Sequence, residues 1–324
     1  MQKQMPGGGA LMRKVLVTGD FDVGGHLFPD DVEVVHIRCP VDEQQIMDVL
    51  PYVHDYILGG PEYLSSHLME VAVRLENVVV MGTSISSFVD MECATKKGIK
   101  LANTPSMNVQ AVTEFTLAMI TVSLAKVFES VENVKEGAGW IQTPRLSLSK
   151  LRVGFVGMGA IASEMAHQLH LRECTTMYYW SRSRRVGLET SLGLRYATLV
   201  EMVNTVDILC IHLKGCAETY NLIDEFILAG ASTKLKILNM SNPKIICPAA
   251  LKKYLQNNAD AFCFIDGYYN EWVDNKGQHS DPYGLLSLPA KNLVVTSHLA
   301  GQEQEVVNSI FMQAKRTLEL TIER

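Results

Sequence analysis

Short runs of β-branched and aliphatic residues recur along this chain, with helix-patterned segments between them. In the first hundred residues the runs stand at 14–18, 32–36, 56–58, 78–80 and 100–102, and the helical patterns at 42–50 and 65–75. Continuous apolar runs are typical of strands buried on both faces, and their alternation with helices favours parallel pairing. The sequence therefore predicts an α/β fold built on parallel sheets.

The same pattern begins again further along the chain, with runs at 153–156, 177–179, 208–211, 236–238, 262–265 and 293–296. We therefore expect two parallel-sheet domains, Rossmann-like or flavodoxin-like, with a cleft between them. An apolar helix expected at 109–127 could pass from one domain to the other, and a helix expected at 303–323 could fold back on the first. This predicts a discontinuous first domain, 1–105 plus 302–324, and a continuous second domain, 106–301.

The composition favours a globular protein that acts on a small molecule. The 324 residues are 47% hydrophobic and 20% charged, with a formal net charge of -6. The basic run Arg182-Ser183-Arg184-Arg185 is short, which argues against a nucleic-acid or membrane-surface partner. The longest apolar helical stretch, 114–126, is shorter than the roughly 20 residues of a membrane span. We therefore expect no nucleic acid and no membrane among the partners.

Cysteine usage and the N-terminus favour a reducing, cytoplasmic location. The seven cysteines form no C-x-x-C pair, and most stand in apolar surroundings, as Cys210 does. This pattern is typical of reduced core thiols. The N-terminal sequence MQKQMPGGGALMRK lacks the apolar core of a secretory signal. The histidines, among them His36 and His54, show no metal-ligand spacing, so no metal site is expected.

A glycine motif follows the strand expected at 153–156. In G-x-G-x-x-A, the first glycine permits a tight turn, the second lets the backbone approach a pyrophosphate, and the small last residue allows close helix-strand packing. The N–H groups at the start of the next helix would then face the phosphates. Because this motif lies between a strand and a helix, it predicts a dinucleotide site. Its residues are Gly157, Met158, Gly159, Ala160, Ile161 and Ala162.

The end of the next expected strand indicates which dinucleotide is bound. An Asp or Glu at this position would bind the ribose 2′-hydroxyl of NAD. This chain instead has Ser181, Arg182 and Ser183, followed by two more arginines. Hydroxyl and guanidinium groups suit a 2′-phosphate. We therefore expect NADP(H) in preference to NAD(H), and the alternative is a solvated basic turn.

An ordered set of further motifs runs through most of the chain. They are Asn103-Thr104-Pro105, Ala111-Val112-Thr113-Glu114, Gly139-Trp140, Ile211-His212-Leu213, Glu218-Thr219, Asn239-Met240-Ser241-Asn242, Ile265-Asp266, Glu271 and Thr296-Ser297-His298-Leu299-Ala300-Gly301. Together with the glycine motif, this set resembles the D-isomer-specific 2-hydroxyacid dehydrogenases, and the basic turn is similar to that of their NADPH-using glyoxylate and hydroxypyruvate reductase branch. The resemblance implies a nucleotide domain in mid-chain, a homodimer formed through it, and hydride transfer from the nicotinamide to a 2-keto acid.

The resemblance also implies roles for individual residues. His298 would protonate the carbonyl oxygen as hydride arrives, and Glu271 would hydrogen-bond the imidazole and keep it oriented and protonated. Asp266 would bind the nicotinamide amide. For His298 and Glu271, the alternative is an ordinary strand-end histidine and a loop carboxylate. The other cofactor positions that the resemblance implies are His212, Leu213, Met240 and Gly301.

Three positions depart from the family pattern. Where the family has the arginine of N-x-x-R-G, which orients and polarises the substrate, this chain has Asn242, and a neutral amide cannot replace a bidentate guanidinium. Where the family has G-x-G, whose amides receive the substrate carboxylate, it has Thr83-Ser84-Ile85. Trp272 replaces the proline after the glutamate. These changes predict a bulky or aromatic keto substrate, or a carbonyl or imine without a neighbouring carboxylate.

The substrate is expected to meet both charge and aromatic surface. Lys244 could supply a point charge, although a strand-end lysine is more often solvated. Tyr268 and Tyr269, with Trp272, would make the pocket mouth aromatic. The positions expected to contact the substrate are Gly60, Thr83, Ser84, Ile85, Lys244 and Trp272. The expected catalytic positions are His298, Glu271 and Asn242.

Two classes of function stay open at this point. The first is an NADPH-dependent reductase acting on an atypical carbonyl compound. The second is an NADP(H)-binding sensor or regulatory protein that keeps the fold without the chemistry. The missing arginine favours the sensor, whereas His298 and Glu271 count against it, because a sensor needs neither residue.

Overall fold

The computed structural model describes residues 12–24, 27–137, 140, 142, 144–269 and 280–322. The chain divides into two compact units: unit 1 comprises Met1–Pro105 and Val307–Arg324, and unit 2 comprises Ser106–Val306. The second boundary lies later than the expected position between 301 and 302. The reason is that the first buried side chain of the last helix is that of Val307, which packs in the core of unit 1.

Unit 1 is built on a five-stranded parallel sheet with the order β2-β1-β3-β4-β5. This is the strand order of flavodoxin-like folds. Its strands are β1 (Arg13–Thr18), β2 (Val32–Ile37), β3 (Asp55–Leu58), β4 (Asn77–Val80) and β5 (Lys100–Asn103). β3 and β4 are buried along their whole length, as expected of inner strands covered on both faces.

Helices cover both faces of the unit 1 sheet. Successive strand residues point to opposite faces, so Tyr56 and Leu58 pack in one core and Ile57, between them, packs in the other. The first core is shared with three short helices, and the second with the last helix. These helices are α1 (Glu43–Val49), α2 (Ser66–Val71), α3 (Met91–Lys96) and α11 (Gln304–Ile322).

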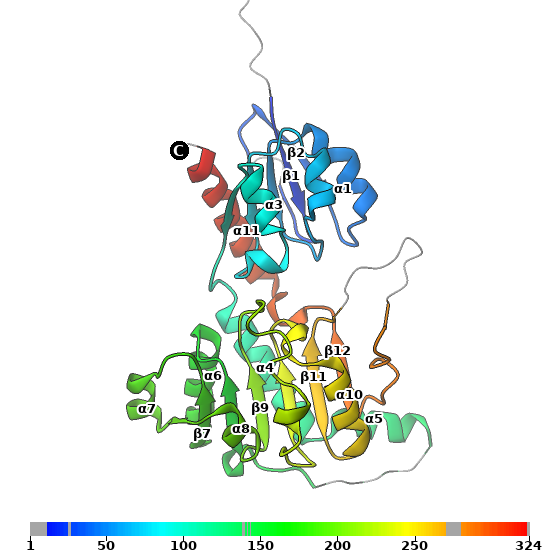
Figure 1. Cartoon of the computed structure of the whole chain (residues 1–324), viewed down its shortest axis with the longest axis vertical. Coiled ribbons are helices and arrows are strands. Elements are labelled where there is room, and N and C mark those ends of the chain that lie inside the picture. The colour runs from blue at the N-terminus through cyan, green and yellow to red at the C-terminus, as the bar shows by residue number, and fades with distance from the viewer. Residues whose placement is uncertain are drawn as a thin grey trace, which may run out of the picture. The chain divides into compact units, whose positions relative to one another are not determined.

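The last helix of the chain, α11, completes the core behind the first strand. Figure 1 shows α11 in red within the same unit as the blue N-terminal strands. Val307, Phe311 and Ala314 stand at helical spacing on its buried face and pack with Val15 and Val17 of β1. Residues from the two ends of the sequence therefore share one apolar core.

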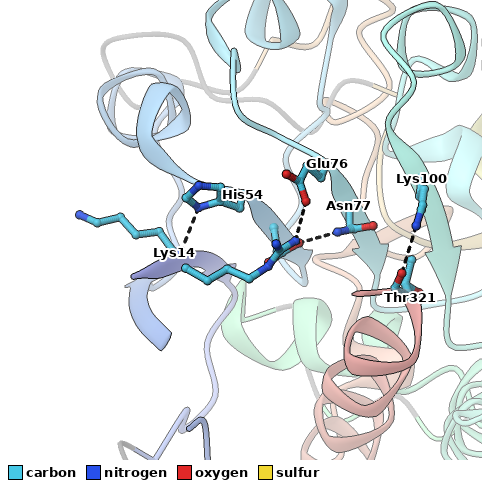
Figure 2. A network of polar contacts seen from close by, with 8 residues as sticks. Lys14, His54, Glu76, Asn77, Lys100 and Thr321 are labelled. Carbon is cyan, nitrogen blue, oxygen red and sulfur yellow. Dashed lines mark hydrogen bonds and ion pairs between the residues drawn. The ribbon is translucent and has the colours of Figure 1, made fainter. Parts of the chain in front are cut away.

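A partly buried ion pair joins the strands of unit 1 at the amino end of the sheet. The Nε and Nη2 atoms of Arg13 lie 2.5 and 2.7 Å from the carboxylate oxygens of Asp55, whose side chain is fully buried. Arg13 also donates to Glu76 at 2.8 Å, and Asn77 Nδ2 donates to Asp55 at 2.7 Å. Figure 2 shows Glu76 and Asn77 in this network, and beside it Lys100, whose amine donates to the Thr321 carbonyl of α11.

Unit 2 is built on a seven-stranded parallel sheet with the order β12-β11-β10-β9-β6-β7-β8. Counted from β6, this is the dinucleotide-binding order 3-2-1-4-5-6 with one more strand at the edge. The strands are β6 (Arg152–Val156), β7 (Thr176–Trp180), β8 (Arg195–Tyr196), β9 (Ile208–Ile211), β10 (Lys236–Asn239), β11 (Phe262–Asp266) and β12 (Leu293–Thr296). Both units are thus of the α/β class, as the sequence predicts.

Helices also cover both faces of the unit 2 sheet. α4 and α6 pack in the core of one face, and α8, α9 and α10 in that of the other. The helices are α4 (Val109–Leu124), α5 (Val127–Lys135), α6 (Ala160–Leu171), α7 (Val186–Leu192), α8 (Leu199–Val203), α9 (Glu225–Leu228) and α10 (Pro248–Asn257). The short 3₁₀ turns in the two units are η1 (Leu50–Tyr52), η2 (Ile85–Ser87), η3 (Leu148–Lys150), η4 (Pro243–Ile245) and η5 (Leu299–Gly301).

The helix expected at 109–127 is confirmed over Val109–Leu124, but its expected end is wrong. α4 ends at Leu124, and Lys126 then takes a left-handed backbone conformation with φ of 51°, after which α5 begins in a new direction. The two helices meet at a bend of 55°. Among the described residues, no single helix is long and apolar enough to cross a membrane, and α4 and α5 meet such a criterion only as this bent pair.

Candidate active site

The cofactor positions expected in unit 2 lie at one edge of its sheet. They follow the carboxyl ends of β6, β7, β9, β10, β11 and β12, and these ends share an edge because all the strands are parallel. β6 and β9 are neighbours in the sheet although β7 and β8 separate them in sequence. Ligands of open α/β sheets bind outside the carboxyl ends at such a switch point.

The first glycine of the motif is required by the close packing of the loop. Gly157 has φ of +92°, and its N–H donates to the Trp180 carbonyl at 2.8 Å. A Cβ atom added here would lie 2.6 Å from the carbonyl oxygen of His212 and 3.1 Å from Cγ of Leu213. Only glycine fits this conformation and this contact. The glycine loop therefore touches the residues that follow β9.

The second half of the motif is open in the way a pyrophosphate site requires. Gly159 stands at the N-cap of α6 with no side chain capping the helix, and a Cβ atom added there would meet no described atom within 4 Å. The first backbone N–H groups of α6 are therefore available to an anion, and the helix dipole favours negative charge at this end. Ala162 is fully buried where α6 packs on the sheet. These residues fit a dinucleotide.

The basic turn after β7 uses most of its polar groups internally. Ser181 Oγ donates to the Ser183 carbonyl at 2.6 Å. Arg184 pairs with Glu189, and Arg185 Nε donates to the Met158 carbonyl of the glycine loop at 3.1 Å. Arg182 is exposed, and no described residue makes a hydrogen bond or ion pair with its guanidinium. A contact with Cys216 and, to a smaller extent, the charge of Arg182 lower the pKa of the Glu218 carboxyl. In this turn Arg182 is thus the arginine whose charge is available to a ligand.

His212, the residue after β9, has a buried ring without hydrogen-bond partners. The residue as a whole is partly exposed, but both ring nitrogens are shielded from water and have no partner among the described residues. Burial lowers the pKa of His212 to about 4, because the charged form is poorly solvated there. The imidazole is therefore neutral at neutral pH, with an unfilled donor and acceptor at the edge where a cofactor would lie.

Asp266, at the end of β11, holds the loop that carries His298. Its Oδ1 accepts from the Thr296 hydroxyl at 2.6 Å and from the Leu299 N–H at 2.7 Å, and its Oδ2 accepts from the Ala300 N–H at 2.8 Å. These three donors bracket His298, whose backbone is left-handed with φ of 56°. Such a conformation in a non-glycine residue persists only where the surroundings fix it. Nicotinamide binding by Asp266 stays a prediction.

Several predicted positions fall outside the described residues. Glu271 and Trp272 lie in the interval 270–279, so the proposed pairing of Glu271 with His298 stays a prediction. Gly139 is also outside the described residues. Gly301 ends η5, and Met240 follows β10, so both stand at the same sheet edge as the glycine motif.

Asn242, at the position of the family arginine, makes local contacts. Its Oδ1 accepts the Lys244 N–H at 2.9 Å, which caps η4, and a Cβ atom added to Gly215 would lie 2.7 Å from its Nδ2. Lys244 lies with its amine 5.6 Å from the centre of the Tyr220 ring, a cation-π contact. Catalysis by Asn242 and substrate binding by Lys244 stay predictions.

Tyr268 and Tyr269 have roles inside unit 2. The Tyr268 hydroxyl donates to Asp281 at 2.5 Å, and the Tyr269 hydroxyl donates to the Ile246 carbonyl at 2.9 Å. Both rings pack against the core beside β11. Both rings are thus partly buried at the margin of this core, and an aromatic pocket mouth formed by them stays a prediction.

The substrate positions expected in unit 1 follow β3 and β4. Gly60 comes after β3, and Thr83-Ser84-Ile85 comes after β4, so both lie at the carboxyl edge of the unit 1 sheet. The Thr83 carbonyl accepts Asn103 Nδ2 at 2.7 Å, and Ser84 Oγ accepts the Ser87 hydroxyl at 2.9 Å. Their polar atoms therefore shape the loop, and contact with a substrate stays a prediction.

A buried carboxyl group beside Gly60 has no counterpart in the expectations from sequence. Glu62 is 1% exposed, and its Oε1 accepts hydrogen bonds from the hydroxyls of Thr18 and Tyr56, the latter at 2.6 Å. A Cβ atom added to Gly60 would lie 2.2 Å from Oε2 of Glu62. Burial raises the pKa of Glu62 above its usual value, against the hydrogen bonds that lower it. A glutamate in a Gly-Gly-Pro-Glu loop carries no sequence signal of burial.

The stability of unit 1 is expected to fall with rising pH through Glu62. The folded-state pKa lies above the unfolded value of about 4.3, so the stability that the neutral acid contributes is present below that value and is lost as pH rises through the folded pKa. Glu62→Gln keeps an acceptor for Thr18 and Tyr56 but cannot ionise. The free energy of unfolding should be measured by urea titration at a series of pH values from about 4 upward. The stability of Glu62→Gln relative to the wild type should increase as pH rises through the folded-state pKa of Glu62.

The control for this prediction is Glu43→Gln, at an exposed position of the same unit. It should leave the pH profile of the wild type almost unchanged. If the free energy of unfolding of Glu62→Gln differs from that of the wild type by the same amount at every pH, the titration of Glu62 is contradicted. The difference would then come from side-chain packing alone.

Comparison with known proteins identifies the family of this architecture. The family profile described as D-isomer specific 2-hydroxyacid dehydrogenase, NAD binding domain, matches residues 117–300. A glyoxylate reductase of Aeropyrum pernix is 31% identical over 259 residues, covering 78% of this chain and 74% of that protein. A glyoxylate/hydroxypyruvate reductase B of Yersinia enterocolitica is 24% identical over 256 residues, covering 77% of this chain and 75% of that protein.

A solved structure has a similar fold. D-lactate dehydrogenase of Aquifex aeolicus, in complex with NAD and lactic acid, has a TM-score of 0.80 at 18% identity and covers 95% of each chain. This likeness concerns the fold, whereas the profile match spans more than half of the sequence. The chain belongs to the D-isomer specific 2-hydroxyacid dehydrogenase family.

Proposed function

We propose that this protein is a 2-hydroxyacid dehydrogenase-type reductase that uses NADPH to reduce the carbonyl group of a small organic substrate. The observation that carries the cofactor choice is the turn after β7, which has no carboxylate for a ribose 2′-hydroxyl and presents the uncommitted guanidinium of Arg182. Relatives named as glyoxylate and hydroxypyruvate reductases support the reaction class. By resemblance to the family we further propose a cytoplasmic homodimer.

The residues of this chain would divide the work as follows. The N–H groups at the start of α6 would hold the pyrophosphate, and Arg182 would hold the 2′-phosphate. When bound, the nicotinamide supplies the hydride. His298 would give its proton to the carbonyl oxygen, with Glu271 orienting the ring, and Asp266 would keep the His298 loop in its left-handed conformation.

The substrate is proposed to differ from a small 2-keto acid. A guanidinium at position 242 would grip a carboxylate and carbonyl in a bidentate manner, whereas the Asn242 amide oxygen already accepts the Lys244 N–H. A bulky or aromatic ketone, or a carbonyl or imine without an adjacent carboxylate, needs less of that charge. A panel of such compounds, together with glyoxylate and hydroxypyruvate, should be screened by NADPH absorbance.

The side chain of Asn242 caps η4, where the family has its catalytic arginine. This favours a second candidate function, an NADP(H)-binding sensor without turnover. The same screen separates the two. NADPH oxidation with any compound of the panel supports the reductase. Silence across the whole panel, with tight NADPH binding by fluorescence, would replace the reductase with the sensor.

Arg182→Ala is expected to weaken NADPH binding about 10- to 100-fold and to change NADH binding no more than about twofold, the range of one charge-assisted hydrogen bond to a phosphate. Fluorescence titration of both cofactors measures this. Arg172→Ala is the matched control, because it removes one exposed arginine of unit 2 at the far end of α6. Equal losses for NADPH and NADH in Arg182→Ala would reject the 2′-phosphate assignment.

A further inference from the structure

Two of the three arginines in the basic turn are held by groups of the protein. Arg184 Nη2 and Nε lie 2.5 and 3.1 Å from the two carboxylate oxygens of Glu189, a bidentate pair. The Arg184 guanidinium also lies 5.7 Å from the centre of the Tyr196 ring. Glu189 belongs to α7, which starts directly after the turn. The guanidinium of Arg184 is thus neutralised by a carboxylate of α7.

Tyr179 connects this pair to the glycine loop. Its ring is fully buried in β7, and its hydroxyl donates to Glu189 Oε1 at 2.5 Å and accepts the Arg185 N–H at 2.7 Å. The Arg185 side chain continues the path, because its Nε donates to the Met158 carbonyl at 3.1 Å. A chain of hydrogen bonds therefore runs from α7 through the basic turn to the loop proposed to hold the pyrophosphate.

We infer that Glu189 is a specificity-determining residue of the cofactor site, which withholds Arg184 from the 2′-phosphate so that Arg182 alone of the three arginines binds it. This inference rests on the proposed use of NADPH. Arg185 cannot turn to the phosphate without releasing the Met158 carbonyl, and Arg184 cannot do so without leaving an ionised carboxylate beside Tyr179. Arg182 makes no hydrogen bond or ion pair with a described residue, and its charge acts on the Glu218 carboxylate only through space.

The physical basis is competition between two anions for one guanidinium. Glu189 is ionised at neutral pH, since the Arg184 guanidinium and then the Tyr179 hydroxyl lower its pKa. A phosphate must displace this carboxylate to reach Arg184, and the carboxylate also repels it. The Glu189–Arg184 pair therefore fixes the turn and lowers the affinity for NADPH. Affinity should rise when the carboxylate loses its charge.

The test is the replacement Glu189→Gln, which keeps the size of the side chain and an acceptor for Tyr179. We expect NADPH to bind roughly five- to tenfold more tightly and NADH to stay within about twofold, the effect of one partly exposed charge-assisted contact. Glu225→Gln is the matched control. Glu225 pairs with Lys253 at 2.5 Å in unit 2, so this variant makes the same charge change in another ion pair, whose carboxylate side chain is 69% exposed against 15% for Glu189. It should leave the NADPH/NADH ratio as in the wild type.

A double-mutant cycle assigns the gain to Arg184. Arg184→Ala alone should leave NADPH affinity within about threefold of the wild type, because the arginine is already withheld. Adding Arg184→Ala to Glu189→Gln should remove most of the gain, and what remains is the relief of repulsion. The inference is overturned if Arg184→Ala alone weakens NADPH as strongly as Arg182→Ala, or if Glu189→Gln binds NADPH no better than Glu225→Gln.

These results are distinguishable from a failure of the proposed function. If the wild type binds NADH as tightly as NADPH and Arg182→Ala affects both equally, the NADPH proposal fails whatever Glu189→Gln does. If the wild type prefers NADPH and Arg182→Ala removes the preference, the proposal stands, and the cycle alone decides the role of Glu189. NADH affinity, measured in every variant, reports that the nucleotide site has stayed folded.

Discussion

Replacing His298 with asparagine is expected to lower kcat about 10²- to 10⁴-fold, the usual contribution of a general acid, and to leave NADPH binding within about twofold. The carbonyl oxygen gains negative charge as hydride arrives, and an amide cannot supply the proton. Asparagine is the informative replacement because it adopts the left-handed conformation found at this position, with φ of 56°, more readily than alanine does. The decrease in kcat is then caused by the loss of the general acid and not by a rearranged loop.

The measurement is steady-state turnover of the best substrate from the NADPH screen, with the cofactor dissociation constant measured separately. His170→Asn, in the last turn of α6, serves as the control because it removes another histidine of unit 2. His298→Asn with wild-type turnover would show that another group protonates the substrate. A loss confined to NADPH binding would place His298 in the cofactor site instead.

Replacing Arg13 with methionine is expected to lower the free energy of unfolding of unit 1 by about 3 kcal/mol, because it leaves the carboxylate of Asp55 buried without a counterion. Methionine keeps much of the apolar stem, so the loss reports the charge. Because the chain has two units, unfolding need not be two-state. Hydrogen exchange at the amides of β1, β3 and β4 therefore measures the effect where it arises.

Two variants control this prediction. Arg38→Met removes the exposed pair with Asp20, whose atoms lie 3.4 Å apart with side chains 60% and 68% exposed, and it should change protection very little. The double replacement Arg13→Met with Asp55→Asn should recover part of the stability, since no unpaired charge remains. A single Arg13→Met variant as stable as Arg38→Met would mean that the Asp55 carboxylate is satisfied by Asn77 alone.

The strands could be predicted from the sequence because their signal is local, except for the two-residue edge strand β8 (Arg195–Tyr196), which has no apolar run. The continuous apolar runs of β3, β4 and β9 reflect burial on both faces of a parallel sheet, and each run lies in the chain where its strand begins and ends. The glycine motif can also be identified from the sequence, because one of its glycines is needed for a tight turn and the other for close approach of the backbone to a pyrophosphate. Family membership followed from several such motifs in order.

Other features depend on contacts between distant residues and leave no local mark. Nothing in the sequence around Lys126 predicts a left-handed residue, so the sequence predicts a helix that runs on to 127 and does not predict α5 beyond it. The burial of Glu62 depends on Thr18 and Tyr56 from other strands. The sequence likewise shows three arginines after β7 but does not show that Glu189 already holds one of them.

The discontinuity of unit 1 also sets the order in which the chain can fold during its synthesis. β1 is made before unit 2, but Phe311 and Ala314, which close the core against Val15 and Val17, are made after it. Domains generally fold as units while the chain is being made. Unit 2, whose residues are contiguous, is therefore synthesised completely before unit 1 can finish folding. Until α11 leaves the ribosome, one apolar face of the unit 1 sheet lacks the helix that covers it.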